Sequence, residues 1–77
     1  MQKRPLHQIA QDIQNNWHNV HYAAIPYLEA MFELNYITDD YYLDSAKSVV
    51  LYFLSNATSW RGDVARAIKA ELKEMCK

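Results

Sequence analysis

The sequence predicts an all-α fold, a compact bundle of about four short helices in a single domain that spans residues 1–77. Apolar residues recur at helical spacing along most of the chain. The composition is 51% hydrophobic and 13% aromatic with one Gly and two Pro, which favours compact and regular structure. A chain of 77 residues is close to the size at which one hydrophobic core just offsets chain entropy.

The first helix is predicted from about Pro5 to Asn16. Pro5 suits the first turn, where its missing N–H costs nothing, and asparagines around residue 16 compete for backbone hydrogen bonds and end the helix. The apolar residues at i, i+3, i+4, i+7 and i+11 make one stripe: Leu6, Ile9, Ala10, Ile13 and Trp17.

The second helix lies between His21 and Asn35, a segment interrupted by Pro26. Because proline disfavours helix at the preceding residue, either the helix begins near residues 24–26 or a longer helix kinks there. We favour the first alternative. The residues expected to pack are Tyr27, Leu28, Met31, Phe32 and Leu34, and residues 35–40 are expected to form a loop.

The third helix is predicted to start between Thr38 and Asp44, either of which suits an N-cap. Its run Val49–Leu54 is apolar almost all round, so we expect it to be the most buried helix. A buried strand is the alternative for this run, but the chain offers no evident partner strand.

The fourth helix is predicted to start after Ser59, with Gly62 in its first turn, and to end near Met75. The short connection makes the last two helices a helical hairpin. The expected core stripe is Val64, Ile68, Leu72 and Met75. The opposite stripe is basic and consists of Arg66, Lys69, Lys73 and Lys77.

Two segments are candidate binding sites. The first is an acidic, tyrosine-rich patch formed by Asp39, Asp40, Tyr41, Tyr42 and Asp44. Tyrosine supplies large contact area at small entropic cost, which is typical of protein interfaces. The alternative is that the acids only cap a helix and solvate a loop.

The second candidate is the corner Trp60-Arg61-Gly62-Asp63 together with Arg66, Lys69 and Lys73. A helix N-terminus with nearby cations has the ingredients of an anion or phosphate site. Alternatively, Trp60 fills the core, Arg61 pairs with an acid such as Asp63 or Asp44, and the lysines solvate an outer face.

Other functional classes are disfavoured by the sequence. No Ser–His–Asp, Cys–His or phosphate-loop pattern is present, so we expect no enzyme and no cofactor. The spacing of His7, His18 and His21 does not match a metal motif, and the lone Cys76 suits a reducing cytoplasm. No run of about 20 apolar residues spans a membrane. The net charge of −1 gives no global attraction to nucleic acid.

The segments NNWHNVHYAAIPYLEAM and DSAKSVVLYFLSNATSWRGDVARAIKAELKEM resemble a family of small uncharacterised helical proteins encoded by bacteriophages and prophages. The strongest marks are Tyr27–Met31, Asp44–Ser48 and Ser59–Gly62. Members of that family carry a glycine near Tyr42 or Leu43, which this chain lacks. The resemblance implies a cytoplasmic setting inside a bacterial host and transfers no residue roles.

Three functions follow as expectations in that setting. The first is a non-enzymatic inhibitor, for counter-defence or host takeover, that binds a host protein stoichiometrically and forms a homo-oligomer if an apolar patch needs covering. The second is a sponge for a signalling nucleotide, with Trp60 stacking on the base. The third is a nucleic-acid-binding regulator that uses the last helix. The aromatic residues expected outside are Tyr22, Tyr36, Tyr41, Tyr42 and Tyr52.

Overall fold

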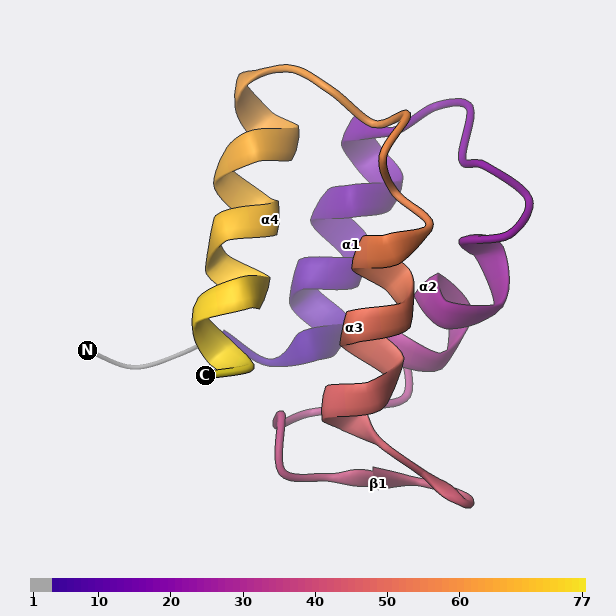
Figure 1. Ribbon diagram of the computed structural model, residues 1–77, viewed down its shortest axis with the longest axis vertical. Coiled ribbons are helices and arrows are strands. Elements are labelled where there is room, and N and C mark those ends of the chain that lie inside the picture. The colour runs from indigo at the N-terminus through magenta and orange to yellow at the C-terminus, as the bar shows by residue number, and fades with distance from the viewer. Residues whose placement is uncertain (1–3) are drawn as a thin grey trace.

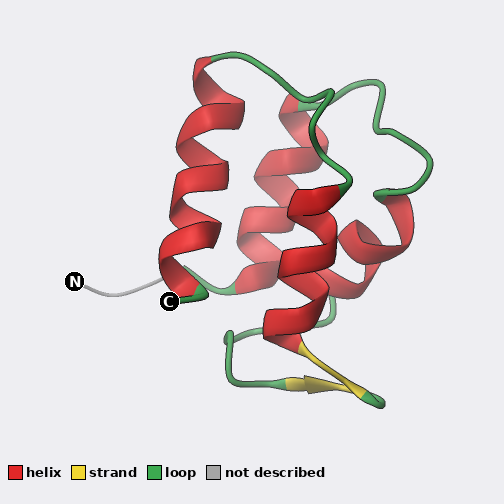
Figure 2. Cartoon of the chain, viewed as in Figure 1, coloured by secondary structure: helices red, strands yellow, loops and turns green. Residues whose placement is uncertain are grey.

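The structure describes residues 4–77, and within them the computed structural model has four helices and one two-stranded antiparallel hairpin (Figure 1, Figure 2). The elements in order are α1 (Leu6–Asn16), α2 (Ile25–Met31), β1 (Asp40–Tyr41), β2 (Asp44–Ser45), α3 (Ala46–Ser55) and α4 (Asp63–Met75). The helices enclose one apolar core, and the hairpin lies at one end of them. The fold is therefore mostly α, and the strict all-α prediction is corrected by the hairpin.

Helix α1 has the predicted stripe. Leu6, Ile9, Ala10 and Ile13 are buried on one face, and Trp17 continues it beyond the last turn. The backbone N–H groups of Leu6 and His7 donate to the carbonyl oxygens of Asn35 and Leu34, both at 2.9 Å. These bonds satisfy first-turn donors that have no partner inside the helix, so they fix the start of α1 against the chain that leaves α2.

Helix α2 begins at Ile25 with Pro26 in its first turn, which confirms the favoured alternative over a kinked helix. Leu28 and Met31 are buried, as is Leu34 just beyond the helix, whereas Tyr27 and Phe32 are half-buried. Two exposed glutamates lie on this part of the chain, Glu29 on α2 and Glu33 in the turn that follows it.

The hairpin was not predicted. Asp40 pairs with Ser45 and Tyr41 with Asp44, which leaves Tyr42 and Leu43 as a two-residue turn. Tyr42 has a φ of +54°. A positive φ at the first central position is typical of a type II′ hairpin turn, where glycine is preferred. Because this turn has no Asn-Gly or Asp-Gly pair, no local pattern predicts it.

Helix α3 begins at Ala46, later than the predicted start between Thr38 and Asp44. The hydroxyl oxygen of its N-cap, Ser45, accepts from the Ser48 backbone N–H at 3.1 Å. The segment Val49–Leu54 is helical, but it is not buried all round: Leu51 is 45% exposed and Tyr52 is 53% exposed. The buried residues of α3 are Ala46, Val49, Val50 and Phe53.

Helix α4 begins at Asp63, not directly after Ser59, because Gly62 serves as the N-cap. Gly62 has φ +114° and ψ 177°, a conformation open essentially to glycine alone. The buried residues of α4 are Ala65, Ile68, Leu72 and Met75. Val64 is 47% exposed, so its assignment to the core was wrong. Residues 56–62 connect α3 to α4, which runs back in the opposite direction (Figure 1).

Three aromatic rings join the middle of the core to the α3–α4 connection. The indole rings of Trp17 and Trp60 stack with centroids 5.5 Å apart and planes 11° apart. Trp17 also meets Phe53 edge-on at 6.1 Å. Trp60 is 4% exposed, which confirms that it fills the core. Within residues 4–77, no helix combines the length and apolar character that a membrane span requires.

Candidate functional site

A groove lies between α2, α3 and the hairpin, and its volume is about 640 Å³. Three tyrosines and three carboxylates line it: Tyr27, Tyr41, Tyr52, Glu29, Glu33 and Asp44. Its apolar floor includes the buried residues Ala30 and Val49. We call this surface the tyrosine–acid groove. Its size falls within the range of about 300–1,000 Å³ that is usual for ligand pockets.

The tyrosines of the groove come from three elements. Tyr27 from α2 and Tyr52 from α3 stack with centroids 5.5 Å apart and planes 26° apart. Tyr41 from β1 donates its hydroxyl hydrogen bond to Glu33 Oε2 at 3.2 Å. The ring of Tyr41 also contacts Tyr42 edge-on at 4.8 Å. Packing of α2 against α3 and the hairpin therefore gathers aromatic side chains that are distant in sequence.

The electrostatic field in the groove is negative. The pKa of Tyr41 is raised above its ordinary value of 10.0, first by burial, then by the hydrogen bond and charge of Glu33, with a further contribution from the charge of Glu29. Among the described residues that line the groove, none is basic. Glu29 and Asp44 take part in no ion pair within residues 4–77.

The acids predicted for the tyrosine-rich patch have different positions. The carboxylate Oδ2 of Asp39 accepts from the backbone N–H groups of Asn35 and Tyr36, both at 3.0 Å, so Asp39 stabilises the loop. Asp40 is exposed on β1, and Tyr42 is exposed at the hairpin turn. Of the predicted patch, only Tyr41 and Asp44 line the groove.

Sequence reasoning missed the α2 and α3 contributions to this groove. Tyr27 was assigned to packing, and Glu29 and Glu33 were not singled out. Glu29 and Glu33 are four apart, a spacing that predicts a shared acidic face if both are helical, although α2 ends at Met31 before Glu33. The approach of Tyr52 to Tyr27 depends on tertiary packing, and no local pattern predicts it.

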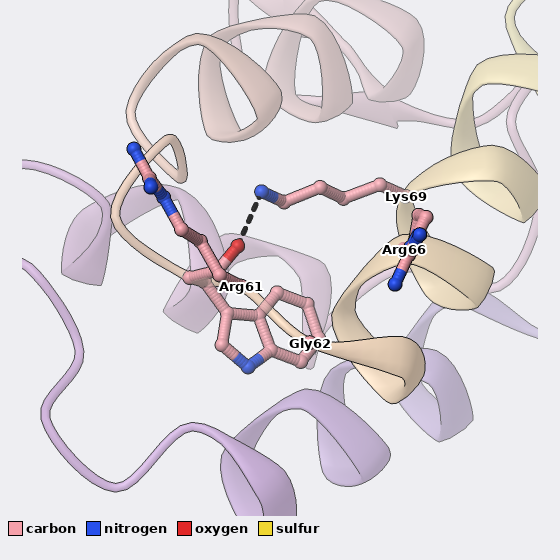
Figure 3. Close-up of a pocket in the computed structure, with 5 residues that line it drawn as sticks. Arg61, Gly62, Arg66 and Lys69 are labelled. Carbon is pink, nitrogen blue, oxygen red and sulfur yellow. Dashed lines mark hydrogen bonds between the residues drawn. The ribbon is translucent and has the colours of Figure 1, made fainter.

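A second, smaller hollow of about 300 Å³ lies where the chain enters α4 (Figure 3). Trp60, Arg61, Gly62, Arg66 and Lys69 line it, and we call it the cationic pocket. The amine of Lys69 donates to the Trp60 carbonyl oxygen at 2.6 Å, as the dashed line in Figure 3 marks. Burial and the charges of Lys73 and Arg61 lower the pKa of Lys69 below its ordinary value.

Two of the three cationic side chains in the cationic pocket, Arg66 and Lys69, already have partners within the chain. Arg66 Nη2 lies 2.8 Å from Asp63 Oδ1, in an exposed ion pair of small energetic value. Arg61 takes part in no ion pair within residues 4–77, so the expected pairing with Asp63 or Asp44 is not found. Lys73 is exposed one turn beyond Lys69 and does not line the pocket. Because Trp60 is buried against Trp17, its indole is not free to stack on a nucleotide base.

The histidines whose spacing does not match a metal motif are not clustered with other possible metal ligands among residues 4–77. In the part of the chain that the structure describes, no group of three His, Cys, Asp or Glu side chains is arranged to hold a metal ion. His18 and His21 are exposed, and His21 contacts the ring of Tyr22 at 4.7 Å. The half-buried Cys76 thiol has a pKa raised by burial, which reduces its reactivity.

Comparison of the chain with protein-family models, curated proteins and solved structures gave no match. The resemblance to small phage-encoded proteins stays a prediction from the sequence motifs. Function must therefore be argued from the two surface hollows.

Proposed function

We propose that the chain is a small non-enzymatic binding protein that acts stoichiometrically on a host protein, for counter-defence or host takeover in a bacterial cytoplasm. The single observation that carries the proposal is the tyrosine–acid groove. Interfaces are enriched in tyrosine because a rigid ring covers much area at little entropic cost. A groove that gathers three such rings is better suited to recognition than to stabilising the isolated fold.

Exposed apolar side chains beside the groove support this proposal. Tyr42 and Leu43 form the turn of the hairpin, and the Leu43 side chain is fully exposed. Backbone at a positive φ costs a residue with a side chain of order 1 kcal/mol. Such strain, at an exposed turn that buries nothing within the chain, is typical of segments kept for contact with a partner.

Capture from host lysate tests the proposal. The bait is the whole chain, and the groove variant is the double substitution Glu29→Gln, Glu33→Gln. The matched control is Asp63→Asn, Glu74→Gln, which removes the same charge from exposed ion pairs of α4. We expect one protein to be recovered by wild type and control and lost with the groove variant. Equal recovery by all three baits would contradict the proposal.

A second candidate function is a sponge for a phosphate-bearing signalling nucleotide, and the cationic pocket favours it. Arg61, Arg66 and Lys69 line one hollow, and cations of this kind bind phosphate. The base would need a platform other than Trp60. A thermal-shift screen of linear and cyclic nucleotides tests this function, because saturating ligand raises the unfolding temperature. No shift at any concentration would exclude it.

The third expectation, a nucleic-acid-binding regulator, depends on Arg66, Lys69 and Lys73. Two of these cations already interact within the chain, Arg66 with Asp63 and Lys69 with the Trp60 carbonyl. No further observation favours this function over the other two. Fluorescence anisotropy at low salt, with a Lys69→Glu, Lys73→Glu variant, remains its test.

A further inference from the structure

The tyrosine–acid groove has an excess of negative charge with no counter-charge of its own. Glu29 of α2, Glu33 just beyond the end of α2 and Asp44 of the hairpin line it. Only Glu33 has a side-chain partner within residues 4–77, and that partner is the neutral Tyr41 hydroxyl. Like charges gathered around one hollow repel each other and lower the stability of the isolated fold. A cation supplied from outside would remove this cost.

The aromatic side chains of the groove complement such a cation. Tyr27 and Tyr52 stand as a stacked pair beside the carboxylates. A cation over a tyrosine face is attracted by the ring, and the attraction grows when water is excluded. The buried floor of Ala30 and Val49 can pack against the methylene groups of a long side chain.

Arginine fits this combination better than lysine does. Its planar guanidinium binds a carboxylate through two parallel hydrogen bonds and also stacks on aromatic rings. The groove offers both partners, since Glu29, Glu33 and Tyr52 all line it. Its volume of about 640 Å³ has room for a side chain together with part of the backbone that carries it.

We propose that the tyrosine–acid groove binds an arginine-bearing segment of the partner protein, with the guanidinium held between the groove carboxylates and the tyrosine rings. This inference rests on the proposed function and names the chemistry of the partner. Charge complementarity selects the occupant, since the described lining is acidic and aromatic without a basic side chain. The exposed Leu43 beside the groove adds an apolar contact to the same segment.

A second copy of this chain is the competing occupant. The cationic pocket lies at the end of the bundle away from the hairpin, so two copies would have to meet head to tail (Figure 1). Such a head-to-tail contact either closes into a ring or continues into an open chain, and in both cases the mass exceeds that of one chain. Light scattering distinguishes the occupants: the arginine-segment proposal predicts a mass that does not change with protein concentration or salt.

The decisive probe is a set of fluorescein-labelled alanine-based peptides that differ only at several positions occupied by arginine, lysine or citrulline. Citrulline keeps the shape of arginine and removes its charge. We expect the arginine peptide to bind most tightly, the lysine peptide less tightly and the citrulline peptide not at all at up to about 1 mM protein. Fluorescence anisotropy measures the affinities, and rising salt should weaken binding.

Variants locate the binding site of the peptide. We expect the Glu29→Gln, Glu33→Gln protein to bind the arginine peptide about tenfold more weakly or worse. The control Asp63→Asn, Glu74→Gln should bind as wild type does. Tyr52→Leu should also weaken binding, whereas Tyr36→Leu, exposed outside the groove, should not. Circular dichroism establishes that each variant is folded.

Three results would overturn the inference. They are equal binding of the arginine and citrulline peptides, arginine-peptide binding that the groove substitutions leave unchanged, and salt-sensitive self-association that the same substitutions abolish. Lysate capture tests the proposed function separately from the arginine assignment. If lysate capture is lost with the groove variant but no arginine peptide binds, the binding role stands and the arginine assignment is wrong. If the groove variant recovers the partner as well as wild type does, the proposed function itself is wrong.

Discussion

Replacement of Trp60 by alanine tests whether the tryptophan of the α3–α4 connection belongs to the core. Its side chain is 4% exposed and stacks on Trp17 at 5.5 Å. Removal of a buried tryptophan costs about 3–5 kcal/mol, of which the stack contributes about 0.5–1.5 kcal/mol. A chain of 77 residues has a free energy of unfolding of about 4–12 kcal/mol. Trp60→Ala should therefore remove at least about a quarter of it.

Urea unfolding followed by far-ultraviolet circular dichroism measures this loss without using tryptophan fluorescence. A double-mutant cycle with Trp17→Phe isolates the energy of the stack, because residues in contact deviate from additivity. The control is Tyr36→Ala, an exposed site where a change within about 0.5 kcal/mol is expected. A loss of less than about 1 kcal/mol for Trp60→Ala with an unchanged m value would refute the reasoning. Trp60 would then be available for base stacking.

Three further predictions concern the backbone, an ion pair and a titration. Gly62→Ala should cost about 1–3 kcal/mol in urea unfolding, because φ is +114° although no heavy atom lies within 4 Å of the added Cβ. Arg4→Ala should lower the free energy of unfolding by about 1–2 kcal/mol in thermal unfolding. Arg4 donates two hydrogen bonds of 2.7 and 3.0 Å to Glu71 and also forms an ion pair with Asp12. Glu33→Gln should lower the pKa of Tyr41 towards its ordinary value of 10.0, as measured by NMR of the ring carbons. Because folding raises that pKa, wild-type stability should fall as the pH rises from 10.0 through the folded pKa.

For each of these three predictions, one result would contradict the reasoning. A Gly62→Ala protein as stable as wild type would mean that α4 is not capped at the glycine. Arg66→Ala is the control for Arg4→Ala, because its pair with Asp63 is exposed and should be worth less than about 1 kcal/mol. Equal losses of stability in the two variants would show that the ion pairs of Arg4 stabilise the fold no more than an exposed pair does. If Glu33→Gln leaves the pKa of Tyr41 unchanged, the evidence for a negative field in the groove is removed.

The sequence was most predictive where hydrophobic periodicity alone determines structure. The stripe from Leu6 to Trp17 and the start of α2 beside Pro26 follow from local rules, and both are found. The predicted start of α4 was wrong because two local signals for a helix N-terminus competed. Ser59 has a good capping side chain, but Gly62 has the backbone conformation that only glycine adopts readily. Val64 consequently lies in the first turn of α4, at the end of the helix, and is exposed.

The groove was beyond prediction for a different reason. Tyr27 and Tyr52 are each unremarkable within their own helices, and they meet only because α2 packs against α3. The hairpin that brings Tyr41 beside them has no glycine or asparagine in its turn, so its sequence carries no hairpin signal. Candidate residues chosen by adjacency along the chain therefore recovered one side of the site and missed the helical walls.

The most direct test of the central claim is isothermal titration of the partner recovered by the wild-type bait against three proteins. These are the wild type, the groove variant Glu29→Gln, Glu33→Gln, and the pocket variant Arg61→Ala, Arg66→Ala. Binding through the tyrosine–acid groove predicts one partner per chain and a Kd at least about tenfold weaker for the groove variant only. Wild-type affinity in the groove variant together with lost affinity in the pocket variant would contradict it and move the binding site to the start of α4.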